Sequence, residues 1–336
     1  MTYRTVTSAG DSLGSSDTEI ILSGGAFYTF TINAVSTYVD GFTADLINTD
    51  TGRGKKLILP DSTTRMLWPH QKLTILKRNG VLIYVPFSLR WSAKGIVFYV
   101  DPINGDDGND GLASGSGAMK TIQPTATFCQ FGIDTLGTTA MIQLADGTYS
   151  ENVVVYGDPT GADQIAIQGN LTHPENVCWH PSGGFALSVQ DKGIVTVQGI
   201  DFALTGGSGV LLGARQFSVI DFFRCRFGAA SNHLDAAVHA VINAIDQNYE
   251  VYSSPVGCHA HANLSAVIEL GGIPCRIPNA LTFYSWAQAV NGGYVASGGQ
   301  TYSGAGLSGC SGLKASWAAN GIVDSYACFP GSGTSP

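Results

Sequence analysis

The feature that most constrains the fold of this chain is a series of short apolar-alternating runs within residues 141–228, separated by turns that contain Gly or Asp. The segments "MIQLADGTYSENVVVYG" and "ALSVQDKGIVTVQGIDF" hold several such runs, with breaks at Asp146-Gly147 and Lys192-Gly193. Strands this short, whose side chains alternate between two faces, cannot bury an apolar face alone. They become stable when the same unit returns and stacks on itself.

The pattern does return, with a drifting period of roughly 20 to 25 residues. Phe202 in "GIDF" has a counterpart in Phe227 in "RCRF", and Val195 has one in Val219. Short strands with a turn at every corner, without long helical patterns or the regular Leu/Asn ladder of a leucine-rich horseshoe, favour a parallel β-helix. The sequence therefore predicts an all-β protein built on a right-handed parallel β-helix over residues 141–300, with the strand register after residue 230 left open.

The composition agrees with an all-β protein rich in turns. Gly accounts for 43 of the 336 residues, and only 12% of residues are charged although 44% are hydrophobic, which is not the composition of a disordered acidic chain. The formal net charge is -8, and a surface of this sign favours neither nucleic acid nor an anionic membrane as a partner. Neither a membrane-spanning run nor the basic-then-apolar order of a secretion signal is evident, so we expect synthesis in the cytoplasm.

Three further segments flank the predicted coil. Residues 1–92 are expected to form a small antiparallel β-sandwich or barrel, in which "FTADLINTDTGRGKKLILP" is a hairpin with its loop at 48–54. Asn79-Gly80 in "KLTILKRNGVLIYVP" is the strongest short signal for a second hairpin. Residues 93–140 should provide a linker, a strand at 96–100 and a helix at 121–131 that covers the first turn of the coil, and residues 301–336 a Gly-rich C-terminal segment.

Two charged clusters stand out in these flanking segments. The basic cluster comprises Arg53, Lys55, Lys56, Lys72, Lys77 and Arg78. We interpret it as solvated hairpin edges protected by lysine; the alternative is a docking patch for an acidic partner. The loop "DPINGDDGNDG" has the composition of a calcium loop and contains Asp101, Asp106, Asp107 and Asp110. It lacks the Gly at the sixth position and the Glu at the twelfth of an EF-hand, so we interpret it as a structural turn.

The seven cysteines form no C-x-x-C pair, so a zinc knuckle is not expected. Most should be buried small apolar residues, with Cys225 between Phe223 and Phe227 as the clearest case. Cys310 and Cys328 lie in the Gly-rich C-terminal segment, where either free thiols or a disulfide within or between chains would fit the sequence.

Histidines gather in one later segment. His259 and His261 are two residues apart next to Cys258, with His233 and His239 upstream. On a strand, both rings of His-x-His would lie on one face, which is a metal half-site. The alternating "HAHAN" equally fits a polar outer face opposite buried alanines, and that is the interpretation we favour.

Carboxylate pairs are the remaining candidates for chemistry, because glycosidases need two carboxyl groups about 5 to 9 Å apart and adjacent turns lie about 4.8 Å apart. One repeat places Asp201 beside Arg226, and Asp191 beside Gln216 or Arg215. Other acids that could extend a strip are Asp221, Asp246, Glu250 and Glu269. Neighbours of opposite charge favour a surface ladder, so we predict no catalytic, cofactor-binding or metal-binding residues.

The segments "FYVDPINGDDGNDGLASGSGAMKTIQ", "IQLADGTYSENVVVYG" and "IAIQGN" resemble the opening of the pectate-lyase-like right-handed β-helix in phage and prophage tail and fibre proteins. In that family an aromatic-Val-Asp strand, an Asn-Gly-Asp-x-x-Asp-Gly loop and a Thr-Ile-Gln helix start cap the coil. The N-terminal segment is similar to small β domains that precede such helices in virion proteins. The resemblance extends to about residue 230 and is more specific for fold than for activity.

The resemblance implies a phage virion structural protein, a homotrimeric fibre, spike or decoration appendage on the tail or capsid. Its N-terminal domain would dock onto other virion proteins of the capsid, neck or tail, and a host surface glycan is a further candidate partner. The alternative is a receptor-binding tailspike with polysaccharide-degrading activity, as a glycosidase or lyase. "GTYSE" at 147–151 also occurs in pectin methylesterases, but a Leu-Gly-Arg-Pro-Trp segment is missing, so esterase activity is not expected. The expected location is the virion, after synthesis in the host cytoplasm.

Overall fold

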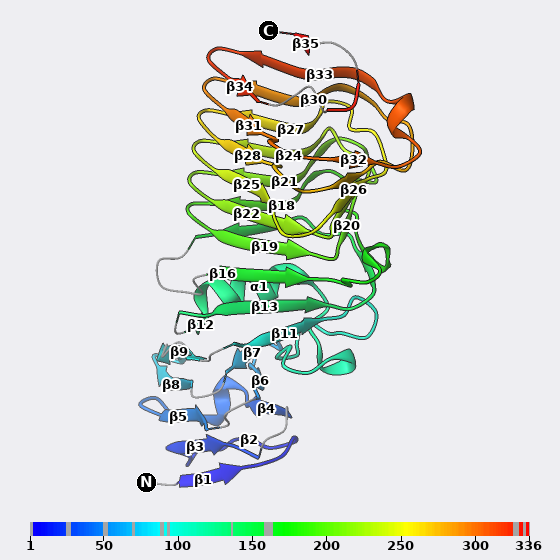
Figure 1. Cartoon of the computed structure of the whole chain (residues 1–336). Helices are drawn as coiled ribbons and strands as arrows, with labels where there is room; N and C mark the ends of the chain where they lie inside the picture. The colour runs from blue at the N-terminus through cyan, green and yellow to red at the C-terminus, as the bar shows by residue number, and fades with distance from the viewer. Residues whose placement is uncertain are drawn as a thin grey trace.

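The computed structural model describes residues 3–24, 28–49, 53–68, 71–87, 91–92, 95–135, 137–157, 164–324, 329–331 and 334–335. The described chain forms a rod of stacked strands, with the N-terminus at one end and the C-terminus at the other (Figure 1). The predicted parallel β-helix is confirmed, and it makes up most of the length of the rod.

Three parallel sheets form the faces of the coil. Sheet I contains β11 (Val97–Val100), β13 (Thr139–Leu144), β16 (Gln164–Gln168), β19 (Ile194–Gln198), β22 (Val219–Phe223), β25 (Val241–Ala244), β28 (Val267–Glu269), β31 (Tyr294–Ala296) and β34 (Ile322–Val323). Sheet II contains β14 (Gly147–Tyr149), β17 (Val177–Trp179), β20 (Asp201–Phe202), β23 (Arg226–Phe227), β26 (Tyr249–Val251), β29 (Cys275–Arg276) and β32 (Tyr302–Ser303). Sheet III contains β15 (Val153–Tyr156), β18 (Gly184–Gln190), β21 (Gly209–Arg215), β24 (Asn232–Ala237), β27 (Cys258–Asn263), β30 (Thr282–Val290), β33 (Ser311–Ala318) and β35 (Thr334–Ser335).

The interior of the coil is built from columns of identical positions in successive turns. On sheet I, a column of fully buried side chains consists of Phe98, Ile142, Ile167, Val197 and Phe222. Burying one such side chain contributes roughly 1.5–3 kcal/mol, and only stacking turns can bury all of them. The sheets continue beyond residue 300 through β32, β33, β34 and β35, so the described part of the Gly-rich C-terminal segment adds to the coil.

The register of the first turns was predicted in part. Phe202 pairs with Phe227 as expected, and their rings stack with centroids 6.1 Å apart. Val195, however, pairs with Ile220, and Val219 pairs with Ile194. The predicted pairing of Val195 with Val219 was wrong by one residue, which in a strand exchanges the buried and exposed faces.

Recurring left-handed turns join sheet III to sheet I and set the later register. In each, two successive residues have positive φ, as at Asp191-Lys192, Gln216-Phe217, Val238-His239, Leu264-Ser265, Asn291-Gly292 and Ala319-Asn320. The second residue of each turn donates its N–H to the first residue of the next, from Lys192 to Gln216 at 3.0 Å through Gly292 to Ala319 at 3.0 Å. The expected proximity of Asp191 and Gln216 is therefore confirmed at the level of the backbone.

The N-terminal unit has two sheets around its own core, but their strands are not purely antiparallel. One sheet contains β1 (Tyr3–Val6), β3 (Glu19–Leu22), β5 (Thr43–Asn48), β8 (Lys72–Arg78) and β9 (Val81–Phe87), and the other β2 (Ser12–Leu13), β4 (Tyr28–Ile32), β6 (Lys55–Ile58) and β7 (Thr64–Leu67). The pairs β1–β3, β3–β5, β2–β4 and β4–β6 are parallel. The expected antiparallel sandwich or barrel is corrected accordingly, because the first six strands alternate between the two sheets.

Of the two predicted hairpins in this unit, one forms. The strands β8 and β9 are antiparallel around Asn79-Gly80, where both residues have positive φ as a tight hairpin turn requires. The hairpin predicted around residues 48–54 was wrong, because β5 pairs with β3 and β8 whereas β6 pairs with β4 and β7. Two apolar strands that follow each other in sequence here lie in opposite sheets.

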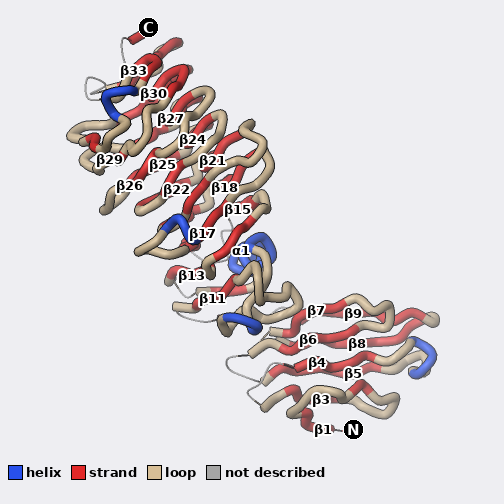
Figure 2. The backbone as a smooth tube through the Cα atoms, turned by 90° about the vertical axis from the view of Figure 1, so that its right-hand side faces the viewer, coloured by secondary structure: helices blue, strands red, loops and turns tan. Residues whose placement is uncertain are grey.

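A helical cap separates the N-terminal unit from the coil. It contains α1 (Ile122–Phe131), together with the short parallel pair β10 (Trp91–Ser92) and β12 (Ile133–Asp134). The predicted strand at 96–100 and helix at 121–131 are thus confirmed within a residue. Short 3-10 helices lie at η1 (Val35–Thr37), η2 (Gly115–Gly117), η3 (Pro174–Asn176) and η4 (Leu307–Gly309). Figure 2 shows the cap between the N-terminal stack and the coil.

The N-terminal unit is attached to the cap by an aromatic cluster and a buried ion pair. Trp68 stacks on Phe128 of α1 with ring centroids 3.8 Å apart and meets the edge of Phe98 at 6.0 Å. Arg53 Nε lies 3.0 Å from a carboxylate oxygen of Asp110, whose side chain is fully buried. The same oxygen accepts the backbone N–H of Gly54 at 2.8 Å. These contacts join two units that the sequence treats as separate.

Candidate functional site

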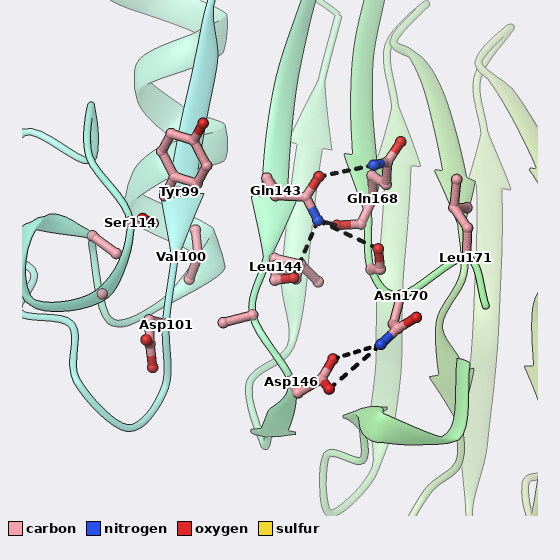
Figure 3. Close-up of a pocket in the computed structure, with 14 residues that line it drawn as sticks. Tyr99, Val100, Asp101, Ser114, Gln143, Leu144, Asp146, Gln168, Asn170 and Leu171 are labelled. Atoms are coloured by element: carbon pink, nitrogen blue, oxygen red, sulfur yellow. Dashed lines mark hydrogen bonds between the residues drawn. The ribbon is translucent and has the colours of Figure 1, made fainter. Parts of the chain in front are cut away.

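A cleft of about 470 Å³ opens where the cap meets the first turns of sheet I. Its floor is an outward-facing column of Tyr99, Gln143 and Gln168, which continues as Gln198 and Phe223. Figure 3 shows the first three of these side chains, with the pair Asp146 and Asn170 below them. An aromatic ring therefore lies at each end of a row of three glutamines.

The amides of this row are bound mainly to one another. Gln168 donates from Nε2 to Oε1 of Gln143 at 2.8 Å, and Gln198 donates in the same way to Gln168 at 2.6 Å. Gln143 in turn donates to the backbone carbonyl of Gln168 at 3.1 Å. The row is therefore a ladder of hydrogen bonds between turns, and most of its polar atoms have partners before any ligand arrives.

The acidic residues around the cleft are also used within the fold. The carboxylate of Asp146 accepts a hydrogen bond from Nδ2 of Asn170 at 3.0 Å. Asp101 accepts the N–H groups of Ile103 and Asn104, both at 2.9 Å. Although its burial acts in the opposite direction, these bonds hold the pKa of Asp101 below its ordinary value. Neither carboxylate is arranged as a proton donor for catalysis.

The other acids of the proposed calcium loop act as structural anchors. Asp107 accepts the N–H groups of Lys120 and Thr121 at 2.9 and 2.8 Å, and Asp106 accepts that of Gly108 at 2.8 Å. Asp110 makes the ion pair with Arg53 described above. Backbone donors therefore occupy positions that a calcium ion would need, in agreement with a structural turn.

Sheet II carries a ladder of alternating charge, which we call the charge ladder: Asp201, Arg226, Glu250 and Arg276 in register on β20, β23, β26 and β29. Arg226 binds Asp201 at 3.2 Å and Glu250 at 3.0 Å, and Arg276 also contacts Glu250. The expected proximity of Asp201 and Arg226 is confirmed. Each carboxylate of the charge ladder is bound to an arginine of an adjacent turn, as expected for a surface ion-pair ladder.

The possible acidic strip of Asp221, Asp246, Glu250 and Glu269 does not form. Asp221 and Glu269 lie on sheet I two turns apart, with Asn243 between them and bound to Asp221 at 2.9 Å. Asp246 lies in a left-handed turn position with φ 56°, and Glu250 lies on sheet II. The sequence could not place them because the number of residues per turn varies.

The two histidines of "HAHAN" do not share a face. His261 faces outward, with Nδ1 2.9 Å from Asp235, whereas His259 is fully buried inside the coil. The reason is a bend that recurs at this corner of sheet III, where two consecutive residues face inward in each turn: Ala186-Leu187, Leu211-Leu212, His233-Leu234, His259-Ala260 and Trp286-Ala287. A metal half-site built from both rings is therefore excluded.

The outward-facing ring of His261 belongs to an ion cluster around Asp235. Its carboxylate binds Arg215 at 2.6 Å as well as His261. Burial acts to raise the pKa of Asp235, but the bond from His261 and the charge of Arg215 hold it below its ordinary value. The group is thus a stable surface ion cluster on sheet III.

Inside the coil, His233 and His259 belong to a hydrogen-bonded chain. His233 Nδ1 lies 3.0 Å from His259 Nδ1, and His259 Nε2 lies 3.2 Å from the hydroxyl of Tyr249. Gln300 donates to Tyr249 at 2.7 Å. With the Tyr249 proton directed to His259 Nε2, His259 would carry its own proton on Nδ1 and donate it to His233.

Burial keeps this chain uncharged. It lowers the pKa of His233 to about 3 and that of His259 well below its ordinary value. A neutral, fully enclosed histidine pair fits a structural role, because neither ring reaches solvent or substrate. His239 lies apart from the pair, in a turn where its ring stacks on Phe217 with centroids 5.1 Å apart.

One member of the basic cluster of the N-terminal unit is buried, and most of the others are partly buried. Lys55 is fully buried, with its ammonium 4.5 Å from the ring centre of Tyr28. Lys77 donates to the carbonyl of Tyr38 at 2.6 Å, and Lys72 pairs with Asp45 at 2.7 Å. The interpretation as solvated edges was wrong for Lys55, because its strand lies with that face against the core.

One group of potential ligands was not found from the sequence. Cys178 and His180 are two residues apart at β17, and Asp201 pairs with Cys178 in the next turn. One ligand atom from each lies within 4.8 Å of the others. The C-x-H spacing was visible in the sequence, but the third member comes from a strand more than twenty residues away.

The remaining cysteines show no reactive arrangement within the part of the chain that the structure covers. Cys225 is buried as expected, and Cys310 is a partly buried free thiol. Cys328 lies outside the described residues, so a disulfide with Cys310 stays a prediction.

Cys178 itself is not activated as a nucleophile. Burial raises the pKa of the Cys178 thiol, which is the opposite of what an activated nucleophile needs.

Comparison with known proteins finds no matching family model, no similar curated protein and no similar solved structure. Among the described helices, none combines the length and apolarity needed to cross a membrane.

Proposed function

We propose that this chain is a structural component of a phage virion, an appendage of the fibre, spike or decoration type that acts by binding and not by catalysis. The observation that carries the proposal is the attachment of a compact N-terminal unit to one end of a stiff rod. Trp68 is packed between cap residues and Asp110 is fully buried at this junction. A unit docked on a particle through this end would project the coil outward as one body.

The chemistry of the surface supports a role without catalysis. The carboxylates of Asp201 and Glu250 are held by Arg226, and Glu151, whose pKa burial raises above its ordinary value, binds the first N–H groups of α1 with both oxygens. A glycosidase needs one carboxyl group of raised pKa that faces a second carboxyl group across the substrate. Here the carboxyl group of raised pKa, Glu151, faces the N-terminal end of α1.

An apolar column on sheet I supports self-association, and we include a homotrimer in the proposal. The column, called the apolar stripe, faces outward over six turns and consists of Ile194, Val219, Val241, Val267, Tyr294 and Ile322. Its ends are well exposed, at 41% for Ile194 and 57% for Ile322. Contiguous exposed apolar surface marks an interaction site, and three copies of a rod can bury one face each around a common axis.

The first experiment tests this stripe. We expect the purified chain to be a trimer by sedimentation and light scattering. Val241→Lys places a charge in the centre of the stripe and should yield monomers with unchanged circular dichroism. Ile103→Lys is the matched control, since Ile103 is 74% exposed but lies in the cap loop, and it should remain trimeric. A wild-type monomer, or a trimer that tolerates Val241→Lys, would contradict the proposed assembly.

The role on a particle needs a separate experiment. A reconstruction of the phage that encodes this chain should show the N-terminal unit in contact with capsid, neck or tail proteins and the coil pointing away. Density that places the far end of the coil on the particle and the N-terminal unit outward would rule out the proposed docking. So would a particle without density for the chain.

A receptor-binding tailspike that degrades polysaccharide is the second candidate, favoured by the cleft over Gln143 and Gln168. Amide side chains beside Tyr99 are suited to sugar hydroxyls and ring faces. Incubation with capsular polysaccharide or lipopolysaccharide of the host, followed by an assay for new reducing ends or unsaturated sugars, separates the two. Product release would establish the enzyme, whereas retention on host cells without product would support a binding appendage.

A further inference from the structure

The group formed by Cys178, His180 and Asp201 lies on the outside of sheet II. Cys178 faces outward because its neighbours Val177 and Trp179 are fully buried. Asp201 lies beside Cys178 in the next turn, and its Oδ2 is 4.0 Å from His180 Nε2. A thiol, an imidazole and a carboxylate therefore converge from two adjacent turns.

Two atoms of this group are buried without a hydrogen-bond partner. These are Nε2 of His180 and Oδ1 of Asp201, and the Asp201 side chain is only 8% exposed. A buried polar atom without a partner costs about 1–3 kcal/mol, and native structures seldom leave such atoms unpaired. The unpartnered His180 Nε2, which converges with a thiol and a carboxylate, therefore calls for a bound group at this place.

A neighbouring arginine holds the carboxylate of Asp201 in position. Arg226 binds Oδ2 of Asp201 at 3.2 Å, on the oxygen that lies 4.0 Å from His180 Nε2, and no hydrogen bond occupies Oδ1. The Cys178 thiol donates to the carbonyl of Glu175 at 3.2 Å, a bond that is given up when the thiol loses its proton. An arginine that orients a ligating carboxylate through its second oxygen is the kind of outer contact that metal centres use.

A catalytic cysteine–histidine–aspartate arrangement fits less well. Such a site uses the two ring nitrogens of histidine for different partners, with the histidine between the other two residues. Here one atom of each residue lies within 4.8 Å of both others, so the three converge on a common point. Convergence on one point is the requirement of a bound ion.

We propose that Cys178, His180 and Asp201 bind a divalent ion of the zinc class. A sulfur, a nitrogen and an oxygen ligand suit Zn²⁺, which in tetrahedral sites holds Cys, His and carboxylate ligands at about 2.0–2.3 Å. Three protein ligands leave the fourth position to water. Binding forms three metal–ligand bonds and releases the thiol proton of Cys178 to solvent.

The ion would tie the turn containing β17 to the turn containing β20. Since it binds only the folded arrangement, it stabilises the coil by mass action. The inference does not depend on the proposed virion role, because it concerns residues on one subunit, away from the apolar stripe on sheet I.

The test uses the purified full-length chain, freed of metal with a chelator and titrated with Co²⁺ and Zn²⁺. We expect one ion per chain, visible absorption typical of tetrahedral Co²⁺ with a sulfur-to-cobalt band, and a higher melting temperature with Zn²⁺. Cys178→Ser should abolish the sulfur band, and His180→Asn should weaken Zn²⁺ binding by roughly 10- to 100-fold or more.

Controls separate this site from adventitious binding. Cys310→Ser removes another partly buried thiol, and His173→Asn removes an exposed histidine nearby; both should bind Co²⁺ as the wild type does. Both ligand variants replace partly exposed side chains, and circular dichroism will establish that they fold. Absence of stoichiometric binding by the wild type would overturn the inference, as would a sulfur band that survives Cys178→Ser.

Discussion

At the scale of single residues, the coil tolerates polar side chains inside when their hydrogen bonds form a continuous chain. Trp286 donates to the hydroxyl of Tyr302 at 3.0 Å, and Tyr302 in turn contacts Gln300. From Gln300 the chain runs through Tyr249 and His259 to His233. Each group fixes the proton position of the next, so the cost of burying these atoms is largely offset. Because burial keeps both histidines neutral, the stability of the fold is sensitive to acid.

The first prediction concerns pH. The folded-state pKa of His233 is about 3, against 6.5 ordinarily, so between these values the unfolded chain binds a proton that the folded chain does not. Stability is therefore complete above about pH 6.5 and falls as the pH decreases, by roughly 1.4 kcal/mol per pH unit for each such proton. His259 adds a loss of the same sign.

The measurement is the urea midpoint between pH 7 and pH 4. His233→Leu, which copies Leu211 at the same position one turn earlier, should make the acid-induced loss shallower by about one proton. It should also lower stability at pH 7 by about 1–3 kcal/mol, because His259 loses its acceptor. His173→Asn, at an exposed position, should keep the wild-type slope. An unchanged slope in His233→Leu would disprove the assignment.

At the scale of elements, the motif "GTYSE" links the first turn of the coil to its cap. Tyr149 points inward and donates its hydroxyl to the carbonyl of Ala145 at 2.9 Å. Glu151 accepts the N–H groups of Ile122 and Gln123 at the start of α1, at 2.6 and 2.9 Å. A carboxylate at this end of a helix satisfies otherwise unpaired donors and complements the helix dipole. The motif is structural here.

The second prediction follows from this cap. Glu151→Ala should destabilise the cap by about 0.5–2 kcal/mol, and faster hydrogen exchange should appear first in α1. Glu269→Ala is a suitable comparison, because Glu269 is an exposed glutamate on β28 and should leave the exchange of α1 unchanged. Equal exchange in α1 for wild type and Glu151→Ala would show that the contact contributes nothing.

At the scale of the whole molecule, stability depends on contacts between neighbouring turns and on one junction. A stacked coil gains stability from each neighbour pair, whereas the N-terminal unit has its own core and meets the cap through few side chains. Trp68 is 7% exposed and belongs to the core of the coil and not to that of the N-terminal unit. We therefore expect Trp68 to couple the unfolding of the two bodies.

The third prediction is that Trp68→Ala separates their unfolding. Losing a buried tryptophan costs about 3–5 kcal/mol, and calorimetry should then show an early transition for the N-terminal unit ahead of the coil. Trp317→Ala, in β33 near the far end of the rod, should leave the coupling of the two bodies intact. A single transition in Trp68→Ala would indicate that the ion pair of Arg53 with Asp110 is sufficient to couple them.

The sequence by itself determined the coil. Interior columns such as Ile142 and Ile167 need partners of the same kind one turn away, so a period in apolar residues specifies stacking. It also determined the hairpin at Asn79-Gly80, the cap strand and the cap helix, because those signals are local. The virion role and the trimer remain proposals that rest on resemblance and on the apolar stripe.

Only the tertiary structure decided which distant residues meet. Turns differ in length, for example 22 residues between Gln216 and Val238 and 28 between Asn291 and Ala319, so an error in one turn shifts every later pairing. The same limit hid the convergence of Asp201 with Cys178 and the inward turn of His259. In the N-terminal unit, β5 and β6 do not form the local hairpin; each pairs in parallel with a non-consecutive strand. The two strands lie in opposite sheets, so that the apolar face of each is buried against the core between the sheets.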